Sequence, residues 1–279
     1  MQEDSTPTMT DQLPSALESL EELVGRLRGR KAVMFIDYDG TLTPIVERPE
    51  LAILSQEMRQ ALRELAGQCT VAVVSGRDLA DVRRLVNIED LLYAGSHGFD
   101  ISGPEGHMDY QQGREYLPAL DQAEQALRRS LQDIAGCQVE RKRFAIAVHF
   151  RRVADDDLSK VEKAVDQILE SHENLRKTGG KKIFELRPDL PWDKGKAIRW
   201  ILQQLGMHRE EVLPFYIGDD LTDEDAFREL RERGITILVR DENRPTAAHF
   251  ALEEPAQVCV FLHRLAQSIK RGGKLVGTH

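Results

Sequence analysis

The chain is expected to fold as an α/β protein with a doubly wound, mostly parallel sheet and an inserted α+β domain. Short, continuously apolar segments alternate with segments whose apolar residues recur at helical spacing, and this alternation predicts the parallel sheet. The middle of the chain instead carries strands with alternating apolar and polar residues, which predicts the insertion. The 279 residues suffice for one large core or two modest ones.

The first part of the chain carries three predicted strands separated by helices. Strands are expected at 33–36, 71–74 and 91–94, where apolar residues run without interruption. The two segments between them have helical spacing, through Met58, Ala61, Leu62 and Leu65, and then through Leu79, Val82 and Val86. Before the first strand, a short stripe predicts a helix docked on the core, with Leu13, Leu17, Leu20, Val24 and Leu27.

The middle of the chain has a different pattern. A stretch rich in Gly, Pro and polar residues, 103–113, predicts a domain boundary. Beyond it, strands with alternating polarity are expected at 144–150 and 182–187. Two helices are marked by Leu117, Leu120, Ala123, Leu127, Leu131 and Ile134, and by Leu158, Val161, Val165, Ile168 and Leu169. We therefore expect residues 111–186 to form an α+β domain with helices on one face of an antiparallel sheet.

The last part of the chain resumes the first pattern, so residues 187–279 should complete the sheet domain begun by residues 1–110. Strands are expected at 213–217 and 235–239. Helices are marked by Ala197, Ile198, Ile201, Leu202 and Leu205, by Ala226, Phe227 and Leu230, and by Val258, Leu262, Leu265 and Ile269. The final residues, 270–279, are expected to be mobile.

Composition limits the classes of partner. The net charge of −9 argues against nucleic acid or an anionic membrane, although a local Lys and Arg cluster can still bind a small anion. No apolar stretch is long enough to cross a bilayer, and Met1–Asp11 lacks the order of a secretory signal. Cys69, Cys137 and Cys259 form no CxxC pair, which predicts buried free thiols without a zinc site or disulfide. We expect a cytoplasmic protein, with a monomer favoured.

The most informative motif is the end of the first strand, where Asp37 and Asp39 precede Gly40. Side chains two apart on a strand point the same way, so these carboxylates face one spot. They repel each other unless a cation lies between them or one is protonated. This pattern predicts a site for a hard cation, beside which an ionised aspartate can attack phosphorus.

Three further polar clusters are expected near that point. Ser75 follows the second strand, Asp219 and Asp220 follow the strand that ends at 217, and Lys194 opens a helix. The carboxyl ends of parallel strands share one edge, where ligands of open α/β sheets bind. A turn of solvated acidic residues is the alternative for each cluster alone, and Ser75 could simply begin a helix. Together the clusters favour a functional site.

These residues resemble the haloacid dehalogenase-like phosphatase superfamily, through Asp37-x-Asp39-Gly40-Thr41, Ser75, Lys194 and Gly218-Asp219-Asp220-x-x-Asp223. The resemblance covers the sheet domain nearly end to end and implies a Rossmann-like core with an inserted cap domain. The finer pattern is similar to the trehalose-6-phosphate phosphatase family. It rests on the stretches 37–45, 74–77, 95–98, 185–188 and 218–224.

The chemistry and the resemblance together imply a role for each residue. Asp37 is expected to be the nucleophile, and Asp39 the general acid and then the base. Mg²⁺ is expected to bind Asp37, Asp219 and the backbone carbonyl of Asp39. Phosphoryl contacts are expected from Ser75 and Lys194, and substrate contacts from Thr41, Gly76, Arg77 and His97. Asp220 and Asp223 are expected to support the metal ligands without binding the ion themselves. Lys196 competes with Lys194, and a structural hydrogen bond is the alternative for His97.

Substrate selection is expected to lie in the inserted domain. Glu140, Lys142 and Glu185 resemble the family's residues for binding a disaccharide. Carboxylates and amines suit sugar hydroxyls, each of which both donates and accepts. The alternative for these residues, and for His149, is a salt bridge on an exposed sheet face.

The sequence therefore predicts a Mg²⁺-dependent phosphatase that releases trehalose from trehalose 6-phosphate through an aspartyl-phosphate. The main alternative is a phosphatase for another sugar phosphate, such as sucrose phosphate or the phosphates of glucosylglycerol or glucosylglycerate. A mutase, a non-catalytic sugar-phosphate sensor and a receiver-like signalling domain phosphorylated on Asp37 are less favoured. An EF-hand is excluded because neither acidic segment has the loop glycine and the terminal glutamate at the required offsets. A dinucleotide-binding site is excluded because no G-x-G-x-x-G motif follows a strand.

Overall fold

The computed structural model describes residues 8–104, 108–180 and 182–276. The chain divides into two compact units. The first comprises Met1–Asp109 and Trp192–His279, and the second comprises Tyr110–Pro191. Among the described residues, no helix combines the length and apolar character needed to cross a membrane.

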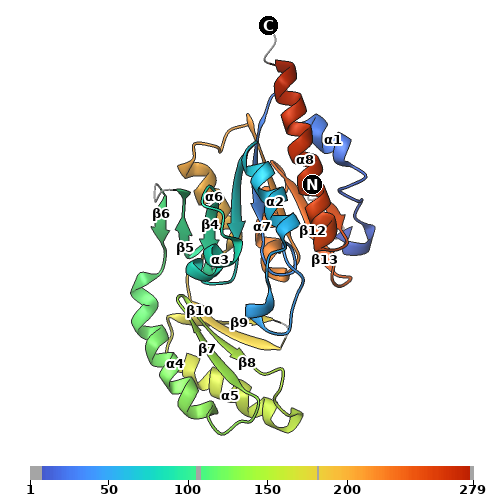
Figure 1. Ribbon diagram of the computed structural model, residues 1–279. Helices are drawn as coiled ribbons and strands as arrows, with labels where there is room; N and C mark the ends of the chain where they lie inside the picture. The colour runs from blue at the N-terminus through green and yellow to red at the C-terminus, as the bar shows by residue number, and fades with distance from the viewer. Residues whose placement is uncertain (1–7, 105–107, 181, 277–279) are drawn as a thin grey trace, which may run out of the picture. The chain divides into compact units, whose positions relative to one another are not determined.

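The first unit is built on an eight-stranded sheet with the order β14-β12-β11-β2-β3-β4-β5-β6, of which the last strand, β6, continues into the second unit. The strands from β14 to β4 run parallel, and β5 runs antiparallel to β4. Their bounds in chain order are β2 Lys31–Ile36, β3 Thr70–Val74, β4 Leu92–Gly95, β5 Asp100–Ser102, β6 Asp109–Gln111, β11 Val212–Gly218, β12 Ile235–Val239 and β14 Phe250–Leu252. The doubly wound, mostly parallel sheet predicted from the sequence is confirmed (Figure 1).

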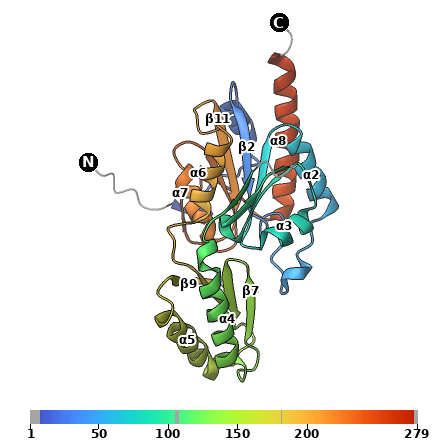
Figure 2. The same ribbon diagram turned by 90° about the vertical axis from the view of Figure 1, so that its left-hand side faces the viewer.

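Helices cover both faces of this sheet. Their bounds are α1 Leu20–Arg26, α2 Gln56–Ala66, α3 Leu79–Val86, α6 Lys194–Gln204, α7 Glu224–Leu230 and α8 Pro255–Val276. Side chains of α1, α2, α3 and α8 share one hydrophobic cluster with one face of the sheet. Figure 2 shows α6 and α7 on the opposite side of β11 and β2 from α2 and α8. Strands buried on both faces need continuous apolar sequences, and β2, β3 and β11 have them.

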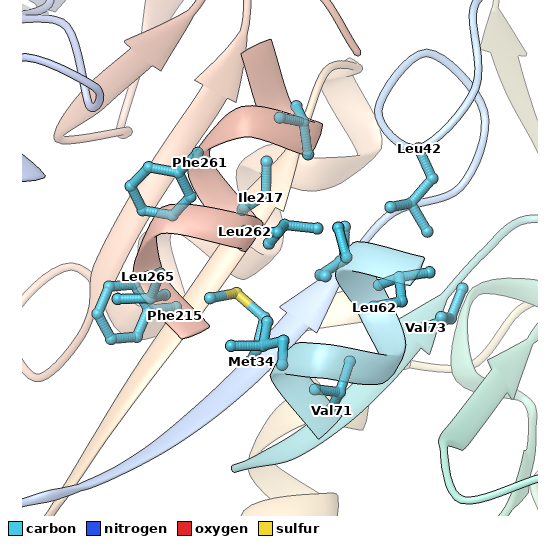
Figure 3. Close-up of a cluster of buried hydrophobic side chains, with 14 of the residues drawn as sticks. Met34, Leu42, Leu62, Val71, Val73, Phe215, Ile217, Phe261, Leu262 and Leu265 are labelled. Carbon is cyan, nitrogen blue, oxygen red and sulfur yellow. The ribbon is translucent and has the colours of Figure 1, made fainter. Parts of the chain in front are cut away.

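The centre of the cluster lies between α2, α8 and the sheet. Figure 3 shows Leu62 of α2 and Phe261 and Leu262 of α8 around Met34 and Phe215 of the sheet. All five side chains are fully buried. Truncating a buried side chain of this size typically costs about 2–5 kcal/mol, so this cluster contributes strongly to the stability of the sheet.

The second unit is a four-stranded antiparallel sheet with the order β7-β8-β10-β9. The strands are β7 Gln138–Lys142, β8 Ala145–His149, β9 Leu175–Gly180 and β10 Ile183–Pro188, and the helices are α4 Leu117–Leu131 and α5 Asp155–Glu170. Both helices share a hydrophobic cluster with Ile146, Val148 and Leu186. Neighbouring residues on these strands therefore face the other side of the sheet. The predicted α+β insertion with helices on one face is confirmed.

Two edge strands of the second unit, β7 and β9, were not predicted from the sequence. The sequence of β7, QVERK, and that of β9, LRKTGG, contain too few apolar residues to show an alternation. Both strands have a partner on one side only, so backbone pairing can hold them in place without a large apolar contribution. The short strands β5 and β6 were also not predicted.

The N-terminal prediction was partly wrong, because the expected helix is helical only over Leu20–Arg26. Upstream, the backbone around Ser15 forms a bridge to Ala251 of β14, through hydrogen bonds from Ala251 N to Pro14 O and from Ala16 N to Ala251 O, both 2.9 Å. Pro14 has no amide hydrogen to donate to a helix. Leu13 and Leu23 are nevertheless buried, so the segment docks on the core as expected.

One smaller expectation needs correction, and the mobility expected of the last residues stays a prediction. Helix α8 continues to Val276, so the described part of 270–279 is helical, and residues 277–279 lie outside the described residues. The three cysteines are free, but each is half-buried where the sequence predicted full burial.

Candidate active site

Asp37 lies at the carboxyl end of β2, and its side chain is buried against a lysine from a distant helix. Lys194, the first residue of α6, donates from Nζ to Asp37 Oδ1 and to Asp223 Oδ1, each at 2.6 Å. Lys196 instead donates to Asp193, the residue before α6. The sequence favoured Lys194 over its competitor Lys196, and the structure brings Lys194 into the carboxylate cluster.

The loop after β11 supplies the other carboxylates. Asp223 is fully buried and accepts from the backbone amides of Asp219, at 3.0 Å, and Asp220, at 2.9 Å. The Asp220 side chain is exposed and accepts from the amide of Leu221. Carboxylate oxygens of Asp37, Asp219 and Asp223 lie within 4.8 Å of one another, which is close enough to share one cation.

Glycine is required beside this cluster. Gly40 has a φ of +82°, and a Cβ there would lie 2.1 Å from Asp219 Oδ2. Thr41 is buried next to it and donates from Oγ1 to Asp219 Oδ1 at 3.1 Å. The turn after β2 therefore both makes room for the Asp219 carboxylate and orients it.

Burial and crowding determine the protonation of the cluster. Burial raises the pKa of Asp37 and of Asp219 above the usual carboxyl range, with neighbouring carboxylates adding to the shift and Lys194 opposing it. Burial alone would lower the pKa of Lys194, but the charges of Asp223 and Asp37 raise it above its ordinary value. Lys194 therefore stays cationic at neutral pH, and a divalent cation would relieve the remaining repulsion.

Asp39 faces a different partner from Asp37. Arg77 donates from Nε to Asp39 Oδ2 and from Nη2 to Asp39 Oδ1, both at 2.7 Å. Arg77 also donates to Asp81 at 3.0 Å and to the carbonyl of Pro49 at 2.8 Å. The Asp39 side chain is 43% exposed and that of Arg77 only 10%, so Asp39 is accessible while its partner is anchored.

The loops after β3 and β4 lie side by side. Ser75 is buried and accepts from the Arg77 amide at 3.1 Å, while its carbonyl accepts from the His97 amide at 2.8 Å. A Cβ on Gly76 would lie 2.7 Å from His97 Nε2. Ser75 lies before α3, which begins at Leu79, so it is not the residue that caps this helix. The structure thus brings Ser75, Gly76 and His97 together at one strand edge.

The predicted sugar-binding residues lie on the face of the second unit's sheet that is opposite α4 and α5, which we call the open face. Glu140 on β7 and Glu185 on β10 are both registered with Ala147 of the strand between them. Lys142 donates to Glu185 Oε1 at 2.8 Å, and Arg187 pairs with the same carboxylate. His149 lies 2.8 Å from Glu140, and this hydrogen bond holds the pKa of Glu140 below its usual range. Charged groups therefore surround small alanine side chains on this face.

Three residues that hold the cluster in place were not predicted from the sequence. The Tyr216 hydroxyl donates to Asp223, Arg244 donates to the carbonyl of Asp219 at 2.8 Å, and Glu224 binds Arg244 at 2.7 Å. The only signal was that Glu224 directly follows the acidic motif. Tyr216 was inside an apolar strand, and Arg244 was in a polar segment without a recognisable pattern.

The fold and the site define the class of protein. A parallel sheet with an inserted α+β unit and these strand-end carboxylates is a haloacid dehalogenase-like fold. A solved structure of the C-terminal domain of a Candida albicans trehalose-6-phosphate phosphatase matches 91% of this chain and 99% of that one, with a TM-score of 0.78 and 24% identity.

The chain belongs to the trehalose-phosphatase family, whose model matches residues 35–256. It is 43% identical to a trehalose 6-phosphate phosphatase of Zea mays, over 94% of this chain and 76% of that protein. It is 48% identical to an uncharacterized glycosyl hydrolase of Mycobacterium tuberculosis, over 91% of this chain but only 20% of that much longer protein. The resemblance inferred from the motifs is thereby confirmed.

Proposed function

We propose that this protein hydrolyses trehalose 6-phosphate to trehalose and phosphate, with Asp37 as the nucleophile. The observation that supports this most is the buried contact of Asp37 with Lys194, next to Asp219 and Asp223. The ammonium of Lys194 offsets part of the negative charge of the phosphoryl group. The anionic nucleophile Asp37 can therefore approach that group. The trehalose-phosphatase family supplies the substrate class, a sugar phosphate.

Mg²⁺ is the cation that fits this site best. The available donors are carboxylate oxygens and backbone carbonyls, which are the ligands that Mg²⁺ prefers. Asp37, Asp219 and the backbone carbonyl of Asp39 would hold the ion, with Asp223 supporting them through the amides of Asp219 and Asp220. When bound, the ion would neutralise charge that develops on the phosphoryl oxygens.

The reaction needs two displacements at phosphorus. In the first, an oxygen of Asp37 bonds to phosphorus, the bond from phosphorus to the sugar oxygen breaks, and Asp39 gives that oxygen a proton. In the second, water attacks phosphorus and gives a proton to Asp39, and the bond to Asp37 breaks to restore the carboxylate. Lys194 and Ser75 would bind phosphoryl oxygens, with Thr41, Gly76 and His97 beside them.

Asp39 can carry protons only if it exchanges a partner. Both of its oxygens accept from Arg77 in the structure, so one must turn to the leaving oxygen or to water. Its 43% exposure permits that change, while Asp81 and the carbonyl of Pro49 keep Arg77 in place. Arg77 would thus orient the carboxylate of Asp39, in addition to lying near the substrate.

We infer that Glu140, Lys142 and Glu185 bind the hydroxyls of the sugar. Glu185 lies in the middle of the open face and is bound by both Lys142 and Arg187. Replacing one charged hydrogen-bonding partner typically costs about 1.5–3 kcal/mol of binding.

Glu185→Gln is therefore expected to raise the KM for trehalose 6-phosphate by about 10-fold or more, while kcat changes little. Steady-state phosphate release measures both constants. Glu170→Gln, at the exposed end of α5, is the matched control and should leave KM unchanged. An unaltered KM in Glu185→Gln would remove Glu185 from the proposed sugar site.

The substrate assignment is tested by a panel of sugar phosphates. Phosphate release is compared for trehalose 6-phosphate, sucrose phosphate, glucosylglycerol phosphate and glucosylglycerate phosphate. We expect kcat/KM to be highest for trehalose 6-phosphate. Equal values across the panel would overturn the substrate while leaving the reaction class, and a higher value for another compound would replace it. Formation of an isomeric sugar phosphate without free phosphate would indicate a mutase.

A further inference from the structure

The backbone of Asp219 is held by an arginine from a distant segment. Arg244 precedes β13, Pro245–Thr246, and donates from Nη2 to the carbonyl of Asp219 at 2.8 Å. Its Nη1 donates to Glu224 Oε1 at 2.7 Å, and only 13% of its side chain is exposed. One guanidinium therefore connects the loop after β11 with the beginning of α7.

Glu224 is itself fixed on several sides. It is buried, and it accepts from the hydroxyl of Thr246 at 2.7 Å and from the amide of Ala247 at 2.9 Å. These contacts leave its carboxylate little freedom to move. Arg244 is thus placed by an ion pair whose acidic partner is anchored to the same segment of backbone.

The N-terminal segment holds the backbone of Arg244. Thr10 donates from its amide to the carbonyl of Arg244 at 3.0 Å, and its hydroxyl accepts from the Arg244 amide at 3.3 Å. That hydroxyl donates to the carbonyl of Glu242 at 2.9 Å, and Thr10 is 2% exposed. Just before it, β1, Thr8–Met9, pairs with β13. A continuous chain of hydrogen bonds therefore runs from Thr10 to Asp219.

We propose that Arg244 is a positioning residue for the metal-binding carboxylate of Asp219, and that Thr10 supports Arg244. This inference rests on the proposed metal site. Asp219 is held at three points: its amide by Asp223, its carboxylate by Thr41 and its carbonyl by Arg244. Without Arg244 the peptide after Asp219 keeps one hydrogen bond, from the Asp220 amide to Asp223, so it can tilt about that bond and move the carboxylate. Residues that orient metal ligands typically contribute about 10–100-fold to metal affinity.

The test is Mg²⁺ binding by Arg244→Gln, measured by titration calorimetry on the full chain. We expect the dissociation constant to rise by about 10-fold or more, and added Mg²⁺ to restore most of kcat. Arg59→Gln is the matched control, because Arg59 is also half-buried and donates to two backbone carbonyls, those of Leu85 and Val86, away from the cluster. It should lower the melting temperature without changing Mg²⁺ affinity.

The outcomes separate this inference from the proposed function. If the wild-type protein binds no Mg²⁺, the metal site itself is wrong. If the wild type binds Mg²⁺ and Arg244→Gln binds it equally well, Arg244 has only a structural role. Thr10→Val preserves the shape of the side chain and serves if Arg244→Gln does not fold. It should weaken Mg²⁺ binding by a smaller factor, and an unchanged affinity would overturn the support from the N-terminal segment.

Discussion

Asp37→Asn is expected to reduce phosphate release from trehalose 6-phosphate by more than about 10³-fold, while trehalose 6-phosphate still binds. Loss of one electrostatic contact in an active site typically costs about 10²–10³-fold, and here the attacking atom itself is replaced. An amide oxygen cannot form a stable acyl phosphate of the kind that Asp37 would form. Steady-state phosphate release measures the rate, and acid quenching tests for a phosphorylated protein, which only the wild type should yield.

The stability of Asp37→Asn provides a second observation. Burial raises the pKa of Asp37, so the folded chain without a cation disfavours its ionised form at neutral pH. This cost is absent below the ordinary carboxyl pKa and grows as the pH rises towards the raised value. The variant should therefore keep or increase its melting temperature at neutral pH. Asp90→Asn, on an exposed loop, is the control for activity, and near-normal turnover in Asp37→Asn would disprove covalent catalysis.

Removal of divalent cations with EDTA is expected to abolish activity, and excess Mg²⁺ to restore it. The carboxylates of Asp37 and Asp219 repel each other, and one ammonium, that of Lys194, cannot neutralise them together with Asp223. A substrate phosphate would add further negative charge to the same place. We therefore expect the cation to be needed both to admit the phosphate and to stabilise the transition state.

Thermal unfolding measures Mg²⁺ binding at the same site in the absence of substrate. A ligand that binds only the folded state stabilises it, by about 2.7 kcal/mol at a concentration 100 times its dissociation constant. The melting temperature should rise with Mg²⁺ in the wild type and much less in Asp219→Asn. EDTA saturated beforehand with Mg²⁺ is the control for effects of the chelator. Full activity in EDTA alone would eliminate the cation from the mechanism.

The sequence was most informative where chemistry and topology coincide. Asp37, Asp219 and Ser75 follow apolar strands, and parallel strands end at one edge, so these side chains had to lie near one another. Lys194 required the resemblance as well, because a helix start alone does not say what its first side chain contacts. The structure places it 2.6 Å from both Asp37 and Asp223.

Other features depend on partners that no local pattern shows. The role of Arg244 is set by Asp219, Glu224 and Thr10, which lie far away in the sequence. The pairing of Asp39 with Arg77 likewise depends on how two loops meet, where the spacing of the motifs suggested only that both are near the substrate. The edge strand β7 was missed because Arg141, at a position on the side of α4 where an apolar residue would show the strand period, is charged and pairs with Asp121 and Glu124.

Two hydrophobic clusters of the described residues share no residue: one surrounds Met34 and Phe215, and the other surrounds Ile146 and Leu186. Mutations that reshape the open face around Ala147 therefore leave the packing around Met34 and Phe215 untouched. With the proposed sugar site on this face, evolution or a directed library can change the sugar preference without altering that first cluster. A phosphatase for a different disaccharide is accordingly best sought by randomising positions 140, 142, 147 and 185 while every residue of the parallel sheet stays as it is.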